Sequence, residues 1–206
     1  MEIEIPVQNI DLKGVLNLPI QNKSFVIFTH GSGGGRYSLR NNYVAKELQK
    51  LGMGTLLFDL LSEKEDESEE NRFNIELLTE RLIAVTKWCT EEERLKGCLF
   101  GYFGTSTGSA TALSAAAYWG TKIKAVVSQG GRPDLAVDIL DLIESPTLLI
   151  VGGEDKQVIG YNRLAYQKLG CIKKMEIVAG ATHLFEEDGA MEKVSDLTTL
   201  WFTKYL

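Results

Sequence analysis

Several features that would place this protein in other classes are scarce or missing. Its 206 residues include three cysteines, an odd number without CxxC spacing, which argues against a disulfide framework or a zinc site and favours a reducing cytoplasm. No apolar run approaches the roughly 20 residues that cross a bilayer. Residues 1–14 alternate charged and apolar residues where a signal peptide would be continuously apolar. We therefore expect a cytoplasmic protein that does not bind membranes.

Positive charge is also in short supply. The chain has 22 lysines and arginines against 28 acidic residues, a net charge of −6. A nucleic-acid-binding protein needs a basic face, so we do not expect nucleic acid as a partner. Six acids and one lysine in residues 63–70 supply most of the excess. This acidic run is expected to be a solvated, mobile loop; the alternative is that it excludes anionic partners.

The composition, with 44% hydrophobic and 24% charged residues, is typical of a folded globular protein, and the length suits one domain over residues 1–206. Residues 2–7 and 12–18 predict two strands that pair antiparallel at one edge of a sheet. Apolar runs that predict buried strands alternate with helical patterns: strands at 24–29, 54–58, 98–103, 125–128, 147–151 and 174–178, and helices near 44–51, 75–89, 107–119, 135–143, 162–169 and 191–205. This alternation predicts a three-layer α/β domain with a mostly parallel sheet, helices on both faces and no second domain.

A short glycine-serine motif carries the strongest local signal. Gly104-Thr105-Ser106-Thr107-Gly108 follows a predicted strand and opens a predicted helix. This is the context of a nucleophile elbow, in which a sharp turn presents a serine above the sheet and requires small residues two positions before and after it. The first amides of the helix then point at the site, with the positive end of the helix dipole behind them.

A serine nucleophile needs a base, and the chain has only two histidines, His30 and His183. His183 follows the last predicted strand, and Asp155 follows the strand before it, in Gly152-Gly153-Glu154-Asp155. The chain order Ser106, Asp155, His183 is that of a hydrolase triad, with each member at the end of its own strand. Glu154 and Asp134 are competing candidates for the acid, and His30 is disfavoured as the base because it precedes the serine.

A glycine-rich turn, His30-Gly31-Ser32-Gly33-Gly34-Gly35, follows the strand at 24–29. Glycines let backbone N–H groups approach a developing oxyanion closely. The expected donors are the backbone amides of Ser32 and Thr107. His30 is then expected to hold this loop at the end of its strand.

These motifs together resemble the dienelactone-hydrolase-like branch of the α/β-hydrolase superfamily. They are FTHGSGGG at 28–35, LLFDLL at 56–61, GYFGTSTG at 101–108, GGRPDLA at 130–136, PTLLIVGGEDKQV at 146–158 and GATHLFEE at 180–187. The resemblance covers nearly the whole chain and implies the triad Ser106, Asp155 and His183, with Ser32 and Thr107 as oxyanion donors. Dienelactone hydrolase itself uses a cysteine where this chain has Ser106, so its lactone substrate cannot be carried over.

A rival interpretation starts from the same glycine-rich turn. Gly31 to Arg36 follows a strand, and the next strand ends at Asp59, which is the outline of a dinucleotide-binding unit. The fingerprint fails at its third glycine, where the chain has Arg36, and no Gly-Lys-Ser/Thr of a Walker loop follows. Asp59 is better explained as an acceptor of hydrogen bonds from a nearby loop.

The length of the segment between the predicted strands at 125–128 and 147–151 limits the size of the substrate. Residues 130–146 are too few for a lid, so we expect an open site that suits a small-molecule substrate and that a homodimer could cover. Arg36, Arg40 and Arg132 fall on loops at the edge of the sheet where ligands bind. They would either bind an anionic group of the substrate or brace their loops against Asp59, Asp134 or backbone carbonyls.

The sequence thus predicts a serine hydrolase that needs neither cofactor nor metal and that cleaves a small ester, lactone or thioester. The alternative is a hydrolase-like binding protein without catalytic activity. An intact set of Ser106, Asp155 and His183 weighs against that alternative, since binding alone would not require it.

The nucleophile assignment gives the first testable prediction. We expect Ser106→Ala to abolish labelling by a fluorophosphonate probe, which reacts only with an activated serine, and to cut turnover by several orders of magnitude. Mass spectrometry of the labelled peptide checks the site. Labelling at Ser109, with Ser106→Ala still active, would refute the elbow assignment.

Overall fold

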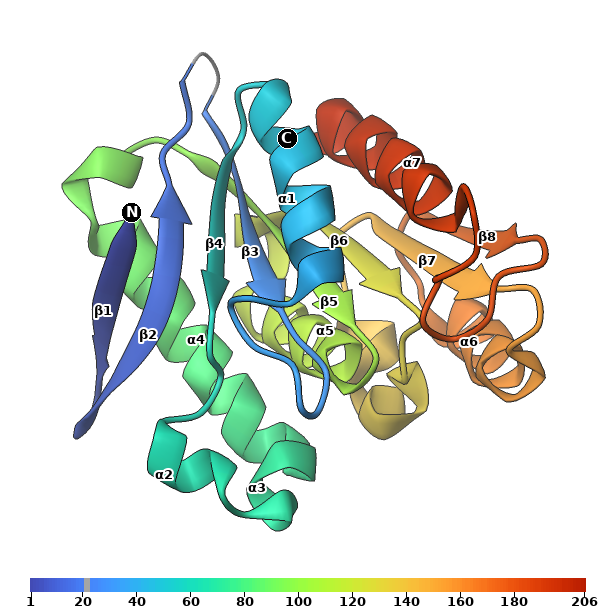
Figure 1. The fold of residues 1–206 in the computed structure, drawn as a ribbon, viewed down its shortest axis with the longest axis horizontal. Coiled ribbons are helices and arrows are strands. Elements are labelled where there is room, and N and C mark those ends of the chain that lie inside the picture. Colours follow the sequence, from blue (N-terminus) through green and yellow to red (C-terminus); the bar gives the residue numbers. More distant parts are fainter. Residues whose placement is uncertain (21–22) are drawn as a thin grey trace.

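The fold is seen in a computed structural model that describes residues 1–20 and 23–206 (Figure 1). Its strands are β1 (Glu2–Val7), β2 (Ile10–Asn17), β3 (Ser24–Thr29), β4 (Gly54–Phe58), β5 (Leu99–Thr105), β6 (Ile123–Gln129), β7 (Thr147–Gly152) and β8 (Lys173–Val178). Its α-helices are α1 (Leu39–Lys50), α2 (Glu63–Asp66), α3 (Glu69–Phe73), α4 (Ile75–Glu91), α5 (Thr107–Trp119), α6 (Lys156–Lys168) and α7 (Ala190–Tyr205). Three 3₁₀ segments, η1 (Glu93–Leu95), η2 (Gly120–Lys122) and η3 (Pro133–Leu142), complete the described elements.

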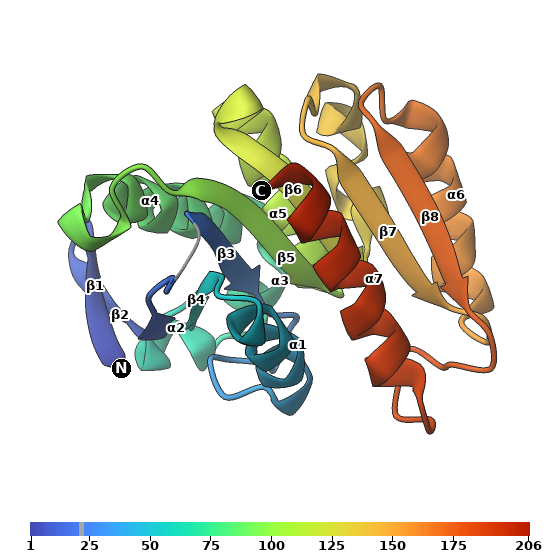
Figure 2. The same cartoon turned by 90° about the horizontal axis from the view of Figure 1, so that it is seen from above.

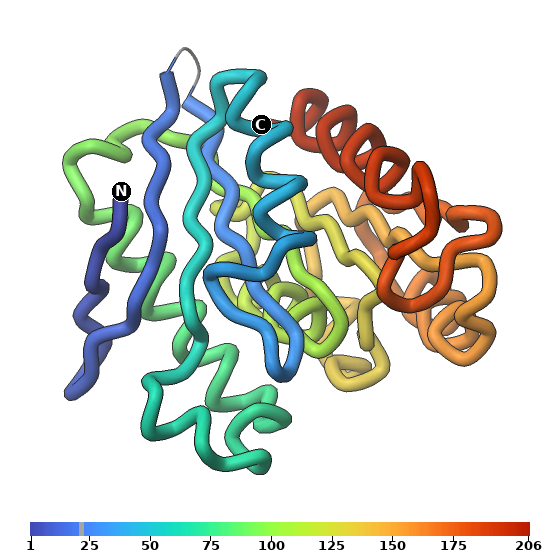
Figure 3. Tube along the Cα trace, in the orientation of Figure 1, coloured from blue at the N-terminus to red at the C-terminus, as the bar shows by residue number. Residues whose placement is uncertain are grey.

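All eight strands form one sheet in the order β1-β2-β4-β3-β5-β6-β7-β8. The pairs β1–β2 and β2–β4 are antiparallel, and the remaining pairs are parallel. The predicted antiparallel edge and the mostly parallel sheet are therefore confirmed. The trace in Figure 3 follows the chain from this edge, across the sheet, to β8 at the opposite edge.

Helices cover both faces of the sheet, as Figure 2 shows from above, with α1 and α7 on one side and α4, α5 and α6 on the other. Alternate residues of the strands supply the two cores, because successive side chains of a strand point to opposite faces. On β3, Phe25 and Ile27 belong to the core under α4 and α5, whereas Val26 and Phe28 belong to the core under α1 and α7. All four are essentially inaccessible to solvent, which explains why this strand is continuously apolar.

One expectation about local structure was wrong. The acidic run at 63–70 forms α2 and α3 instead of a mobile loop. A capping box between Ser62 and Glu65 begins α2, and Glu65 also accepts a hydrogen bond from Arg81 at 2.7 Å. Lys13 pairs with Glu63 at 2.5 Å, so cations distant in the sequence order this segment.

The weak helix expected near 135–143 is the 3₁₀ segment η3, with a kink at Ala136 (φ −126°, ψ 23°). It is the entire connection between β6 and β7 apart from short turns, so no lid is inserted there, as predicted. Among the helices that the structure describes, none combines the length and apolarity that a bilayer span requires.

The contact between α5 and the end of β3 leaves no room for a side chain. A Cβ added at Gly108 would lie 2.4 Å from the carbonyl oxygen of His30 and 2.6 Å from that of Thr29. Thr29 Oγ1 donates a hydrogen bond to the Gly108 carbonyl at 2.8 Å, which holds α5 against β3. Packing of α5 against β3 therefore requires glycine at position 108, two residues after Ser106, where the motif predicted a small residue.

This contact gives a matched pair of substitutions. We expect Gly108→Ala to lower the free energy of unfolding by about 1–3 kcal/mol or more, because backbone atoms must move apart. Gly160→Ala, in the middle of α6 with no atom within 4 Å of the added Cβ, should instead raise it by about 0.5–1 kcal/mol. Urea denaturation of both variants measures the difference, and equal effects would contradict the packing argument.

Candidate active site

Ser106 lies at the sharp turn between β5 and α5, as the motif predicts. Its backbone has φ 50° and ψ −123°, a conformation that costs a non-glycine residue on the order of 1–3 kcal/mol. Backbone hydrogen bonds hold it: Ser106 N–H donates to Gln129 O, and the Ser106 carbonyl accepts from Arg132 N–H, both at 3.1 Å. Gly31 approaches so closely that a Cβ there would lie 2.9 Å from Ser106 Cβ.

Asp155 and His183 meet above the ends of β7 and β8. His183 Nδ1 and Asp155 Oδ2 are 2.6 Å apart, and the Asp155 side chain is 15% exposed against 40% for His183. The other oxygen, Asp155 Oδ1, accepts from Val158 N–H at 3.4 Å and so caps the start of α6. One carboxylate therefore begins a helix and orients the imidazole. This capping role was not anticipated, although a Gly-Glu-Asp sequence before a helix is a signal for it.

The competing acids have other partners. Asp134 accepts two hydrogen bonds from the Arg132 guanidinium, at 2.9 and 2.8 Å. Glu154 is paired with Lys156 at 3.8 Å. Asp155 is thus the carboxylate that the structure places on His183.

Ser106 and His183 line the same cavity, which has a volume of about 900 Å³. Within residues 1–20 and 23–206, no hydrogen bond joins the Ser106 hydroxyl to the imidazole. Hydrogen bonds of catalytic groups are often long without substrate and shorten when it binds. Ser109, the neighbouring hydroxyl, is fully buried and donates to Gly104 O at 2.8 Å, so it is not available as a nucleophile.

The two expected oxyanion donors lie next to each other. Ser32 N–H, on the glycine-rich loop, donates to the Thr107 hydroxyl at 3.0 Å. Thr107 is the first residue of α5, so its own amide lies at the positive end of that helix. The Thr107 side chain, which is 4% exposed, thus ties the two halves of the expected oxyanion hole together. Nothing in the sequence pattern indicated this contact.

His30 holds the glycine-rich loop as a neutral imidazole. Its Nδ1–H donates to Gly31 O at 2.9 Å, and its Nε2 accepts from Leu60 N–H at 3.1 Å. Only the neutral tautomer with its proton on Nδ1 can make both hydrogen bonds. Burial also disfavours the charged imidazolium and lowers the pKa of His30. The ring therefore fastens the loop to the segment after β4.

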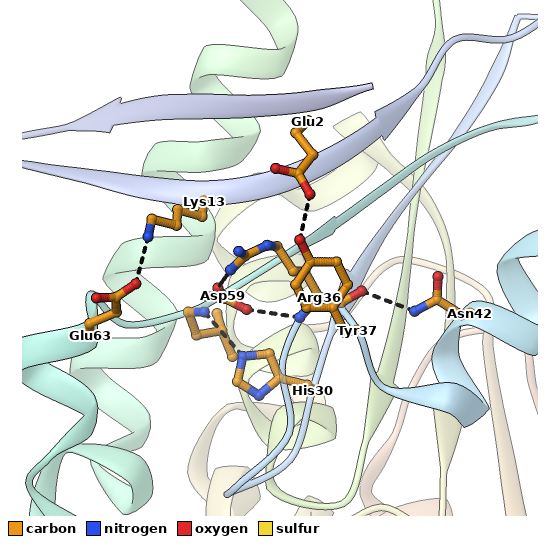
Figure 4. Close-up of polar contacts among 9 residues, drawn as sticks. Glu2, Lys13, His30, Arg36, Tyr37, Asn42, Asp59 and Glu63 are labelled. Atoms are coloured by element: carbon orange, nitrogen blue, oxygen red, sulfur yellow. Dashed lines mark hydrogen bonds and ion pairs between the residues drawn. The ribbon is translucent and has the colours of Figure 1, made fainter.

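A polar network supports the same loop from outside, as Figure 4 shows. Arg36 N–H donates to Asp59 Oδ1 at 2.8 Å, and the Arg36 guanidinium forms an ion pair with the same carboxylate. Asn42 donates to Arg36 O at 2.9 Å, and the Tyr37 hydroxyl donates to Glu2. Asp59 thus has the role of loop acceptor that was expected of it.

The three arginines differ in position. Arg36 and Arg132 are ion-paired with Asp59 and Asp134 and do not line the cavity. Arg40 does line it and donates to the Leu184 carbonyl at 3.2 Å. Of the two roles considered for these arginines, the structure favours bracing: Arg36 pairs with Asp59, Arg132 pairs with Asp134, and Arg40 donates to a backbone carbonyl. Only Arg40 of the three also lines the cavity, so the expected position at the rim is wrong for Arg36 and Arg132.

Sequence reasoning missed the far wall of the cavity. Residues 184–189, directly after His183, and Met191 and Glu192 at the start of α7 form this wall, together with Gln129 from the end of β6. Glu187 belongs to it, and a hydrogen bond from Thr182 lowers its pKa. The run Glu186-Glu187-Asp188 beside the predicted base was the available signal. In the part of the chain that the structure describes, no three His, Cys, Asp or Glu side chains gather as metal ligands.

Solved structures resemble the whole chain. A dienelactone hydrolase from Anabaena variabilis has a crystal structure that matches with a TM-score of 0.98 and 45% sequence identity, covering 100% of this chain and 97% of that one. Est1E from Butyrivibrio proteoclasticus matches with a TM-score of 0.81 and 16% identity, covering 98% of both chains, and shows the fold alone. No protein-family model matches.

A longer relative is found in Mycobacterium tuberculosis under the name "Putative phosphoribosyl transferase". It is 45% identical over 205 residues, which is 100% of this chain and 46% of the relative. The chain therefore spans about half the length of that relative.

The neutral state of His30 predicts a dependence of stability on pH. Because its pKa is lowered on folding, the stability that neutral His30 contributes is fully present above the unfolded value of about 6.5. It is lost as the pH falls below that value, by at most about 1.4 kcal/mol per pH unit, because the unfolded chain takes up the proton first.

We therefore expect the wild type to lose more stability than His30→Gln between pH 7.5 and 5.5, by up to about 1.4 kcal/mol. Urea denaturation of both proteins at the two pH values measures it. The same loss in both would show that His30 does not titrate differently on folding.

Proposed function

The chain belongs to the dienelactone-hydrolase-like family of α/β hydrolases, and from this and the site geometry we propose that it is a serine hydrolase without a cofactor, acting on a small ester, lactone or thioester. The observation that carries the proposal is the 2.6 Å contact between His183 Nδ1 and Asp155 Oδ2 in the cavity that Ser106 lines. A carboxylate on Nδ1 keeps the proton there and leaves Nε2 free to act as the base.

Acylation begins at the serine hydroxyl. Ser106 Oγ attacks the carbonyl carbon of the substrate while His183 Nε2 takes the hydroxyl proton. The carbonyl oxygen becomes an oxyanion, which the amides of Thr107 and Ser32 stabilise, with the Ser32 N–H shared between the oxyanion and the Thr107 hydroxyl. The intermediate collapses, the bond to the leaving alcohol or thiol breaks, and the leaving group takes the proton from His183.

Deacylation repeats these steps with water. His183 Nε2 removes a proton from a water molecule. The water oxygen attacks the carbonyl carbon of the ester that joins the acyl group to Ser106. The second oxyanion uses the same two amides. Its collapse releases the acid and returns the proton to Ser106 Oγ, so the enzyme is regenerated.

The name of the mycobacterial relative does not decide this chain's activity. That relative is more than twice as long as the matched segment, so its name can describe the part outside the match. A binding protein without activity is the remaining alternative, and labelling by an uncharged fluorophosphonate distinguishes it, because only an activated serine reacts.

The decisive experiment replaces the acid. We expect Asp155→Asn to lower kcat on a short acyl ester by about 10⁴, because the imidazole loses the group that fixes its tautomer and stabilises its charge. Asparagine is itself a good N-cap, so α6 should still begin normally. The matched control is Glu154→Gln, the adjacent exposed carboxylate.

Steady-state kinetics of the two variants give the result, with thermal unfolding as a check on folding. The assignment fails if Asp155→Asn retains activity, or if Glu154→Gln loses as much. Absence of turnover and of Ser106 labelling in the wild type would refute the proposed function itself.

A further inference from the structure

The charge on the cavity wall opposite the glycine-rich loop is strongly one-sided. Four carboxylates, Glu186, Glu187, Asp188 and Glu192, line the cavity against one cation, Arg40. Thr182 engages Glu187, but in the described residues no ion pair involves any of the other three. All three residues are exposed, so their carboxylates are accessible to a ligand.

The cations that could have balanced this wall are used elsewhere. Arg36 and Arg132 neutralise Asp59 and Asp134 and lie outside the cavity lining. The start of α7 supplies a partial positive charge near Ala190, equivalent to about half an elementary charge, which is small against the four carboxylates. A cleft lined by one sign of charge raises the local concentration of ligands of the opposite sign.

Gln129 adds an independent polar feature at the base of the cavity. It is 4% exposed and lies at the end of β6, where it is paired in register with Thr105, the residue before the nucleophile. Its Nε2 contacts Met191 Sδ at 3.6 Å, and its Oε1 has no hydrogen-bond partner in residues 1–20 and 23–206. A thioether accepts but cannot donate, so this amide orientation is the one that Met191 favours. A buried acceptor without a donor favours a ligand that brings one.

We infer that the hydrolase proposed above selects substrates bearing a positively charged hydrogen-bond donor, such as a primary ammonium group, on the part that lies against the wall from Gln129 to Glu192. The inference rests on the proposed function and names its substrate class. An ammonium group supplies a positive charge for the three free carboxylates. It also brings an N–H for Gln129 Oε1, which is covered in this structure and becomes available when the side chain turns toward the cavity. A carboxylate in the same place would be repelled by the negative charges of the wall and would leave Gln129 Oε1 unpaired. Both effects disfavour binding of an anionic substrate.

The test compares 4-nitrophenyl esters whose acyl chains have equal length and end in ammonium, methyl or carboxylate. A second series places a trimethylammonium or a tert-butyl group on the leaving alcohol, because either side of the ester can face the wall. We expect kcat/KM to be about tenfold higher for the cationic than for the neutral ester in at least one series at low salt. The preference should shrink in 1 M NaCl, where the screening length falls to about 3 Å.

Matched variants connect the preference to this wall. The triple variant Glu186→Gln, Asp188→Asn, Glu192→Gln should bring the ratio of cationic to neutral kcat/KM close to one. The control Glu67→Gln, Glu69→Gln, Glu70→Gln changes the net charge equally at exposed positions around α3 and should keep the ratio. Gln129→Leu should raise KM for an ammonium-ended acyl ester but not for its trimethylammonium counterpart, which has no N–H to donate.

Equal rates for the cationic and neutral esters in both series, or faster turnover of the carboxylate ester in the first series, would overturn the inference while leaving the hydrolase intact. If no ester is hydrolysed, calorimetric titration of the protein with the matched ω-amino acid amide and dicarboxylic acid monoamide answers the charge question alone. Tighter binding of the amine supports the inference, and equal or tighter binding of the acid refutes it. Fluorophosphonate labelling of Ser106 reports separately on the proposed function.

Discussion

The close approach of α5 to the end of β3 is the constraint on which the site depends. Gly108 brings the helix so near the carbonyls of Thr29 and His30 that no side chain fits between them. The contact holds Ser106 in a conformation that an isolated chain would avoid, and the buried alanines of α5 help to offset that strain. It also fixes the first amide of α5 beside Ser32. One packing contact therefore positions both Ser106, the proposed nucleophile, and the expected oxyanion donors.

Two polar devices hold the loops that this contact cannot reach. On one side of Ser106, neutral His30 and the Arg36–Asp59 pair fasten the glycine-rich loop to the end of β4. On the other, Asp155 caps α6 with one oxygen and orients His183 with the second. In both cases ion pairs or hydrogen bonds form where a loop meets the end of a strand. Asp155 also links the orientation of His183 to the start of α6.

The same devices shape the electrostatics of the cavity. Asp59 and Asp134, which lie outside the cavity lining, form ion pairs with Arg36 and Arg132. These two positive charges therefore brace loops and do not balance the carboxylates of the cavity. The wall formed by Glu186, Asp188 and Glu192 keeps its negative charge. An acidic protein with arginines beside its candidate active site thus has a cavity whose lining is negatively charged, like the chain as a whole.

Much of this protein could be read from its sequence, because the signals are local. Strand and helix patterns repeat within a few residues, and the tight turn at Ser106 requires its glycines at fixed spacing, so the layered fold and the elbow were predictable. The fold then brought Asp155 to His183, as the chain order suggested. The start of α2 also had a local signal, the capping box Ser62-Glu63-Lys64-Glu65, which the expectation of a loop overlooked. Tertiary structure alone decided which arginines face the cavity, and that Gln129 and the start of α7 complete the wall. These outcomes depend on charges and acceptors far apart in the chain, whose partners are set by distances in space that no local pattern records.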